Sequence, residues 1–248
     1  MFPTSSTCCG LLLAGLLAGC ARELPPTSHG SSQPAVLVFY KTAGFYHASI
    51  PAGLAAFQQL GRANHWRVDT TRLATRFVAD TLRRYAAVVF LNTTGEVLDS
   101  AQQVAFERYI GQGHGFVGVH AATDTEYHWP WYGRLVGAYF QNHPAVQAAI
   151  VRVTDAQHPA TSFLPPAWQS TDEWYNFRDL APDLRVLATV DETTYTGGTN
   201  GPAHPFAWCH AYGGGRAFYT AGGHLSENYA DPQFQRHLLG GLRYAMGQ

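Results

Sequence analysis

Three short apolar runs in the first half of the chain predict buried strands. Residues 35–40, 86–91 and 115–119 are almost continuously apolar, a pattern typical of strands covered on both faces of a parallel sheet. Amphipathic helical patterns lie between them, at residues 50–64 and 100–111. This alternation predicts βαβ units, and therefore an α/β fold in which a doubly wound, mostly parallel sheet is flanked by helices.

The second half of the chain has shorter and less regular strand patterns. Strand-like runs occur at residues 148–153, 184–190, 206–209 and 216–220, separated by loops that contain glycine and proline. Short runs bounded by such loops are typical of strands. We expect them to extend the same sheet.

Polar residues predict where two of the helices begin. Ser100, followed three residues later by Gln103, has the spacing of a capping box and predicts the start of the helix at 100–111. Asp231 followed by Pro232 predicts the start of a last helix. The apolar face of that helix is formed by Phe234, Leu238, Leu242 and Ala245.

The beginning of the chain has the features of an export signal. Residues 11–19 are apolar, end in small residues and are too short to span a bilayer as a helix. Residues 17–20, Leu-Ala-Gly-Cys, resemble a bacterial lipobox, in which Cys20 becomes the lipid-bearing first residue after cleavage. Residues 1–10 contain no Lys or Arg, so a plain secretory signal and a misassigned start stay open as alternatives. We expect a lipoprotein signal peptide at 1–20 and an exported protein, held by its lipid on a bacterial membrane and facing the periplasm or the exterior.

The rest of the chain divides into a tether and one domain. Residues 21–34 are rich in Pro, Ser, Thr and Gly, which is typical of a flexible linker. Residues 35–248 are long enough to bury one large core, since the chain is 46% hydrophobic and only 13% charged. We expect a single domain there.

Cysteine usage excludes an intrachain disulfide in the mature domain. Cys8 and Cys9 lie in the predicted signal, and Cys20 would carry the lipid. Cys209 then remains alone inside an apolar run, where a small packing residue is a simpler interpretation than a nucleophile.

The charge balance gives no sign of a polyanionic partner. The formal net charge is −1 and the basic residues are scattered, so no cationic stripe suits a nucleic acid. The 12 histidines stand out instead. Many lie beside glycine, proline or aromatic residues, where an imidazole can be held for metal ligation or proton transfer.

Polar residues follow the predicted parallel strands. The first strand is followed by His47, the second by Thr94, and the third by His120 and Asp124. Because ligands of open α/β sheets bind at the carboxyl ends of the strands, we expect these side chains to converge on one rim.

His120 occupies the tip of a predicted sharp turn between a strand and a helix. Residues 113–122, Gly-His-Gly-Phe-Val-Gly-Val-His-Ala-Ala, have the small residues that such a turn needs. In class I glutamine amidotransferases and their peptidase relatives the tip is a cysteine, which attacks a carbonyl carbon. With His120 there, the chain cannot run that reaction at this position, and a glutaminase or peptidase activity is disfavoured.

Six motifs, in order along the chain, resemble those of the ThuA-like (trehalose utilisation) family. The central one is Gly-Phe-Val-Gly-Val-His-Ala-Ala-Thr-Asp at 115–124. The resemblance extends from about residue 36 to 246 and implies a class I glutamine-amidotransferase-like fold, with flavodoxin-like layers and an association with the catabolism of trehalose and related glucosides. The other motifs lie at 45–50, 92–95, 172–176, 203–208 and 215–224.

Histidines and carboxylates supply the candidate site. As catalytic residues we consider His47, His120, Asp124, Glu173 and His224. As substrate-binding residues we consider Thr94, Trp131, Tyr175, Glu192 and His204. As possible ligands of a divalent metal such as zinc we consider His120, His143 and His224.

Two chemistries fit such a set of side chains. Imidazoles and carboxylates can bind a divalent metal that polarises a carbonyl or hydroxyl group, or they can act directly as general acid and base on a sugar. The chain has no His-Glu-x-x-His or Cys-x-x-Cys pair, so a metal site would be assembled from distant loops. The cofactor therefore stays open at this point.

Structural roles compete with functional ones at several of these positions. His114 and His210 suit ordinary hydrogen-bonded histidines, and His143, before Pro144, suits either role. Residues 129–132, Trp-Pro-Trp-Tyr, could stack on a sugar or cap the core.

The leading hypothesis is an exported enzyme that acts on a small carbohydrate, such as a glucoside or keto-sugar. The alternative is a non-catalytic sugar-binding or scaffold protein on the same fold. The sequence leaves the reaction and the oligomeric state open.

Overall fold

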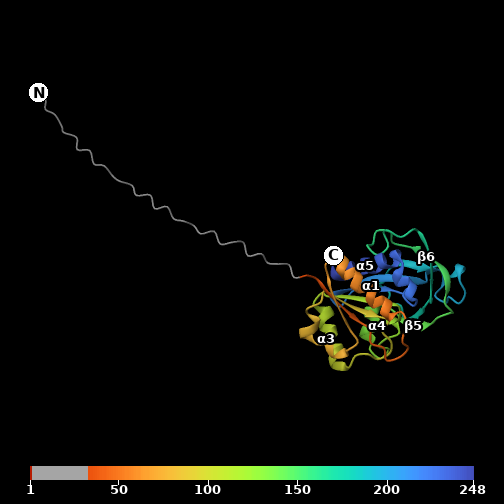
Figure 1. The fold of residues 1–248 in the computed structure, drawn as a ribbon, viewed down its shortest axis with the longest axis horizontal. Coiled ribbons are helices and arrows are strands. Elements are labelled where there is room, and N and C mark those ends of the chain that lie inside the picture. Colours follow the sequence, from red (N-terminus) through yellow and green to blue (C-terminus); the bar gives the residue numbers. More distant parts are fainter. Residues whose placement is uncertain (2–32) are drawn as a thin grey trace. The chain divides into compact units, whose positions relative to one another are not determined.

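The three strands predicted in the first half lie within the parallel part of one large sheet (Figure 1). The structure is a computed structural model that describes residue 1 and residues 33–248. The predicted signal peptide, Cys20 and nearly all of the linker therefore lie outside the described residues. The compact unit comprises Gln33–Gln248.

Nine strands of this unit form the sheet in the order β2-β1-β3-β4-β11-β10-β9-β6-β7. The first five in this order are mutually parallel: β2 (Arg67–Thr71), β1 (Ala35–Phe39), β3 (Ala87–Leu91), β4 (Gly115–Val119) and β11 (Gly215–Thr220). The others pair antiparallel: β10 (Pro205–Tyr212), β9 (Arg185–Val190), β6 (Gln147–Val153) and β7 (Ala167–Asp172). The sequence predicted the extension of the sheet, but not β2 or β7. A separate antiparallel pair joins β5 (Tyr139–Asn142) to β8 (Asn176–Arg178).

Helices cover both faces of the parallel part, which explains why its strands are apolar throughout. On one face, α5 (Pro232–Met246) packs so closely that a Cβ atom on Gly115 would lie 2.4 Å from the Ala245 carbonyl oxygen. On the other, Phe116 contacts α3 (Ser100–Gly111) and α4 (Pro130–Val136) through aromatic rings. The remaining helices are α1 (Ile50–Ala63) and α2 (Ala79–Leu82). The doubly wound α/β class is thus confirmed.

The two predicted helix starts differ in outcome. Asp231 caps α5 by accepting a hydrogen bond from the Gln233 N–H, with Pro232 in the first turn, as predicted. The cap of α3 is Asp99 rather than Ser100, because Asp99 has extended backbone and forms a reciprocal capping box with Gln102. The prediction with Ser100 and Gln103 was wrong by one residue.

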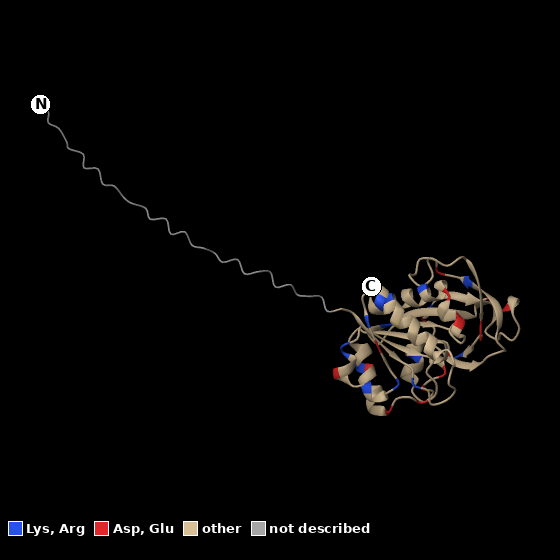
Figure 2. Cartoon of the chain, viewed as in Figure 1, with Lys and Arg blue, Asp and Glu red and all other residues tan. Residues whose placement is uncertain are grey.

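Two further observations concern the charged side chains and the helices of the described residues. Charged side chains of both signs are interspersed over the described residues (Figure 2). Within the same residues, no helix combines the length and the apolar character needed to cross a membrane.

Candidate active site and metal centre

His120 follows directly after β4 and is held in one orientation. Its φ of +48° places it in the left-handed region at the start of a short 3₁₀ turn, His120–Thr123, so the sharp turn lies where the sequence predicts it. Its Nδ1 donates to the Ala221 carbonyl oxygen over 2.7 Å. The other ring nitrogen, Nε2, is buried without a hydrogen-bond partner.

His47 and His224 bring two further imidazoles to His120. They lie in the loops after β1 and β11, which flank β3 and β4 at the carboxyl edge of the sheet. The three ring centroids are 5.0 to 5.3 Å apart and each pair of rings is close to perpendicular. As at His120, one ring nitrogen of each, Nδ1, is buried and lacks a hydrogen-bond partner.

Glu173 completes the cluster from the end of β7. Its Oε2 lies 3.5 Å from His120 Nε2 and 3.1 Å from His224 Nδ1. Its Oε1 lies 3.0 Å from Nδ1 of His143, whose side chain is 40% exposed at the rim. These are ion-pair distances, but Nε2 of His120 and Nδ1 of His224 make no hydrogen bond of acceptable angle.

The geometry suits a shared cation. His47, His120, Glu173 and His224 each offer one ligand atom, and these atoms lie within 4.8 Å of one another. Ligands of tetrahedral zinc, at bond lengths of about 2.1 Å, lie about 3.4 Å apart, so the longest separation in the cluster would shorten by about 1.4 Å to hold one. Close donor atoms that do not hydrogen-bond to each other are what a common metal ligand set requires.

Asp172 fixes the two loops that carry Glu173 and His224. Its buried carboxylate accepts from the backbone N–H groups of Glu173 (2.8 Å), Gly223 (2.8 Å) and His224 (3.1 Å), and from the Asn228 amide. Burial raises the pKa of Asp172, against the opposing effect of His120 and of these N–H groups. In a flat sheet β7 would lie four strands, or about 19 Å, from β11, so the hydrogen bonds show that the antiparallel strands curve back over the site.

Burial and charge compete within the cluster. Burial first, and then the neighbouring His120 and His224, lower the pKa of His47 to about 3, so this imidazole is neutral. The Glu173 carboxylate raises the pKa of His224 against the effect of burial. Burial would raise the pKa of Glu173, but its contacts with His120 and His224 outweigh it and hold the pKa below the usual range.

A cavity of about 270 Å³ opens beside the cluster. Asp124 contributes a second carboxylate to it, and this carboxylate accepts a 2.6 Å hydrogen bond from the Tyr127 hydroxyl. Burial raises the pKa of Asp124, and the bond from Tyr127 opposes the shift. The cavity is lined by Phe45, His47, Asp124, Phe140, His143, Glu173 and Tyr175.

The structure places the other candidate residues at different depths. Tyr175 lines the cavity, with its ring centroid 4.1 Å from that of His120. Thr94 is fully buried and donates to the Phe45 carbonyl oxygen, so it holds the loop before His47. Glu192 and His204 lie behind Tyr175 and pair with each other over 2.8 Å.

Trp131 lies outside the cavity. It sits on α4, stacked on Trp129 with a centroid distance of 5.1 Å and edge-on to Tyr212. The structure thus places it in aromatic packing over the core, one of the two roles that the sequence left open.

Several residues that organise the site were not singled out from the sequence. Ser49 donates to the Gly223 carbonyl oxygen over 2.9 Å, and Asn92 donates to both Ser49 Oγ and that carbonyl. The Asp-Glu doublet at 172–173 and the position of Asn92 at a strand end were the available signals. Their partners are 43 to 174 residues away in sequence, so periodicity could not pair them.

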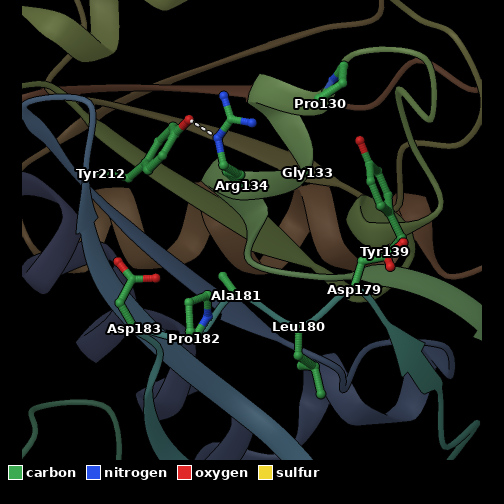
Figure 3. A pocket seen from close by; sticks show the side chains of 10 residues that line it. All are labelled: Pro130, Gly133, Arg134, Tyr139, Asp179, Leu180, Ala181, Pro182, Asp183 and Tyr212. Carbon is green, nitrogen blue, oxygen red and sulfur yellow. Dashed lines mark hydrogen bonds between the residues drawn. The ribbon is translucent and has the colours of Figure 1, made fainter.

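A larger cavity lies away from the imidazoles. It measures about 590 Å³ and runs between α4 and residues 179–183 (Figure 3). Arg134 donates there to the Tyr212 hydroxyl over 2.9 Å. None of the clustered histidines lines it, so size alone does not identify the site.

Among residues 33–248, no sulfur nucleophile lies at the cluster. Cys209 is buried in β10, and burial raises the pKa of its thiol, which disfavours the reactive thiolate. Its placement agrees with a packing role.

Solved structures share this architecture. A protein described as ThuA-like from Bacteroides uniformis is 24% identical, with a TM-score of 0.73 over 88% of this chain and 94% of that one. Another from Parabacteroides merdae is 21% identical, with a TM-score of 0.72 over 86% and 90%. A β-galactosidase from Bacillus circulans is 13% identical, with a TM-score of 0.57, and the match covers 86% of this chain but only 31% of the enzyme. No curated protein matches the chain.

The sheet and the turn tipped by His120 define an α/β protein of the glutamine-amidotransferase-like class. Residues 35–245 match the ThuA family, described as trehalose utilisation. The chain belongs to the ThuA family.

Proposed function

We propose that this protein is a metal-dependent enzyme that acts on a small carbohydrate. The observation that carries the proposal is the convergence of His47, His120, His224 and Glu173, with ligand atoms within 4.8 Å of one another, beside a cavity. Three of the four offer buried ring nitrogens without hydrogen-bond partners. Buried polar atoms normally have hydrogen-bond partners, so three unpartnered ring nitrogens close to one another favour a bound ligand between them.

The charge of the site supports a dication. Glu173 and Asp172 are both buried, and the ion-pair partners of Glu173 among residues 33–248 are imidazoles. Asp172 is held by N–H groups and an amide rather than by Lys or Arg. Metals bind the neutral form of imidazole, so with both carboxylates ionised the ligated set would carry a charge of −2, which one divalent ion would balance.

The donor set indicates the type of metal. Three imidazole nitrogens and one carboxylate oxygen suit zinc and its first-row neighbours rather than magnesium or calcium, which prefer oxygen. The Nδ1 bond from His120 to the Ala221 carbonyl fixes the ring so that Nε2 faces the cluster, as the outer partners of metal-bound histidines do.

The cavity suits a ligand of about one sugar ring. Its volume of about 270 Å³ lies just below the usual range of small-molecule pockets, which begins at about 300 Å³. Phe45 and Phe140 line the cavity with aromatic rings, on which sugar C–H groups can stack. The family description, trehalose utilisation, points to the same class of substrate.

Two groups beside the cluster can move protons. A bound metal would polarise a carbonyl or hydroxyl oxygen of the sugar. Asp124 and His143 line the same cavity and can accept and donate protons around that oxygen. The raised pKa of Asp124 brings the carboxyl closer to the range of a general acid or base.

Metal analysis together with activity assays tests the proposal. Protein spanning residues 33–248 is purified without chelators, its metal content is measured, and turnover of trehalose, glucosides and keto-glucosides is assayed with and without added zinc, manganese or cobalt. We expect about one metal per chain and metal-dependent turnover. Sugar binding without turnover would favour the non-catalytic alternative, and absence of both metal and turnover would contradict the proposal.

We also propose that the domain acts outside the cytoplasm, tethered through a lipid on Cys20. The lipobox-like residues 17–20 and the linker composition at 21–34 support this placement. Metabolic labelling with a radioactive fatty acid tests it: wild type should be labelled, and Cys20→Ser should not. Labelling of neither protein would contradict the anchor.

A further inference from the structure

The buried His204 and the partly buried Glu192 form a pair behind the cavity wall. His204 is 1% exposed, its Nδ1 lies 2.8 Å from Glu192 Oε1, and its Nε2 lies 2.8 Å from the Tyr175 carbonyl oxygen. Glu192 Oε1 also accepts from the backbone N–H groups of Asn200 and Gly201 over 2.8 and 2.9 Å. The pair thus joins the loop around residue 200 to the segment that carries Glu173.

The partners of His204 fix the direction of one of its hydrogen bonds. A carbonyl oxygen can only accept, so Nε2 of His204 donates to the Tyr175 carbonyl oxygen. The other ring nitrogen, Nδ1, faces the Glu192 carboxylate. The other titratable group at the ring is Tyr195, whose hydroxyl lies 3.0 Å from Nδ1.

Tyr175 links this pair to the imidazole cluster. Its ring is 4% exposed and packs on His120 with a centroid distance of 4.1 Å and an interplanar angle of 36°. Two residues earlier, Glu173 enters the cluster. Holding the Tyr175 carbonyl therefore sets the ring that supports His120 and the backbone that presents Glu173.

We infer that Glu192 and His204 are positioning residues of the histidine–carboxylate centre, acting through Tyr175. The inference rests on the proposed metal site, which it deepens by naming what keeps His120 and Glu173 in place. Neither residue lines the cavity, so neither is a catalytic residue.

Cobalt(II) binding tests this role. We compare wild type with His204→Leu, which removes both ring nitrogens, His204→Gln, which retains one amide donor near Tyr175, and Thr193→Ala, a matched control on the loop of Glu192. We expect His204→Leu to weaken cobalt affinity by about 10- to 100-fold, the effect typical of outer partners of metal ligands, and to alter the visible cobalt spectrum. His204→Gln should recover part of the affinity, and Thr193→Ala should match wild type.

A purely structural role would give a different result. In that case His204→Leu would melt at a lower temperature yet bind cobalt with wild-type affinity and spectrum, and the inference would be overturned. Should His204→Leu fail to fold, Glu192→Gln, which keeps the shape of the side chain, is measured in the same way with the same two outcomes.

A second readout does not depend on metal. In ¹⁵N NMR spectra of the metal-free wild type at pH 7.5, we expect Nε2 of His204 to carry the proton that it donates to Tyr175, and an unprotonated Nε2 would overturn the inference. If wild type binds no cobalt while Nε2 of His204 is protonated, the proposed function fails and the tether to Tyr175 stands. The two failures are therefore distinguishable.

Discussion

Two groups of buried histidines differ in a way that identifies the site. Within residues 33–248, six buried imidazole nitrogens lack a hydrogen-bond partner. Three belong to His47, His120 and His224, whose rings lie within 5.3 Å of one another around Glu173. The other three belong to His158, His210 and His237.

Each imidazole of the second group is held separately, by its own hydrogen bond and by packing. His237 donates from Nδ1 to the Ala160 carbonyl oxygen and lies against Phe218, and His210 binds the Leu135 carbonyl oxygen. Burial lowers the pKa of His237 to about 4, so its ring is neutral. A lone unpartnered imidazole therefore indicates burial, whereas several that share a carboxylate and a cavity indicate chemistry.

Removing a member of the first group should have the largest effect. We expect His120→Asn, a residue that tolerates the left-handed backbone, and Glu173→Gln each to weaken zinc affinity by more than about 100-fold, beyond the range of outer-shell changes. Competition titration with a chromogenic chelator measures this.

His210→Gln is the matched control for that prediction. It changes a buried histidine with an equally unpartnered nitrogen but outside the cluster, and zinc affinity should stay at the wild-type value. Equal losses in His120→Asn and His210→Gln would remove the distinction between the two groups.

Asp172→Asn tests whether Asp172 holds the loops that carry Glu173 and His224. The amide offers donors where the carboxylate accepts four N–H groups, so we expect the free energy of unfolding to fall by about 2–4 kcal/mol. Urea unfolding measures the change, and zinc affinity should fall with it. Wild-type stability would show that Asp172 does not hold the loops of Glu173 and His224.

Acid should destabilise the protein through the second group. The unfolded chain takes up a proton at His237 below about pH 6.5, while the folded state resists until about pH 4. This loss in the free energy of unfolding is nearly absent above pH 6.5 and grows as the pH falls. It amounts to about 2 kcal/mol between pH 7 and 5. His237→Asn, which keeps the Nδ1-like donor to Ala160, should lose that part of the slope in urea unfolding at each pH.

His158 remains as an internal reference for this measurement. Burial lowers its pKa to about 4 as well, so a residual acid dependence should persist in His237→Asn. An unchanged slope in the variant would contradict the assignment to His237.

Substitutions of aromatic residues should have the smallest effects, and they should separate stability from sugar affinity. Trp131→Ala, outside the cavity, should lower the free energy of unfolding by about 1–2 kcal/mol without changing sugar affinity. Phe45→Ala, at a cavity residue that is 64% exposed, should stay within about 0.5 kcal/mol of wild-type stability and weaken sugar binding a few-fold. Isothermal titration and urea unfolding separate the two, and a reversed pattern would relocate the sugar site.

Local patterns were sufficient for much of the fold. The apolar runs at β1, β3 and β4 and the cap at Asp231 are properties of neighbouring residues, and the structure shows them where expected. The strand β7 was missed, because Ala167–Asp172 has buried positions only at Trp168 and Asp172 and is polar or exposed elsewhere. Its role comes from pairing with β6, which local sequence does not encode.

The candidate site divides in the same way. Placing His47, His120 and His224 at strand ends follows from the rule for parallel sheets, and the sequence contained it. The position of Glu173 in the cluster depends on the curvature of the antiparallel strands, which brings the end of β7 close to the loop after β11. The hydrogen bonds of Asp172 join these two segments. Glu192 and His204, which were candidates for substrate contact, lie one layer behind because the fold places Tyr175 between them and the cavity.

The sequence by itself determined the family, the alternation of strands and helices, and the set of imidazoles at the carboxyl edge of the parallel strands. Only the tertiary structure decided which of those imidazoles meet, which carboxylate they share, and which aromatic residues face the cavity. The reason is physical: periodicity reports the burial of one residue among its neighbours, whereas a site depends on distances between residues that are joined only by the packing of the whole chain.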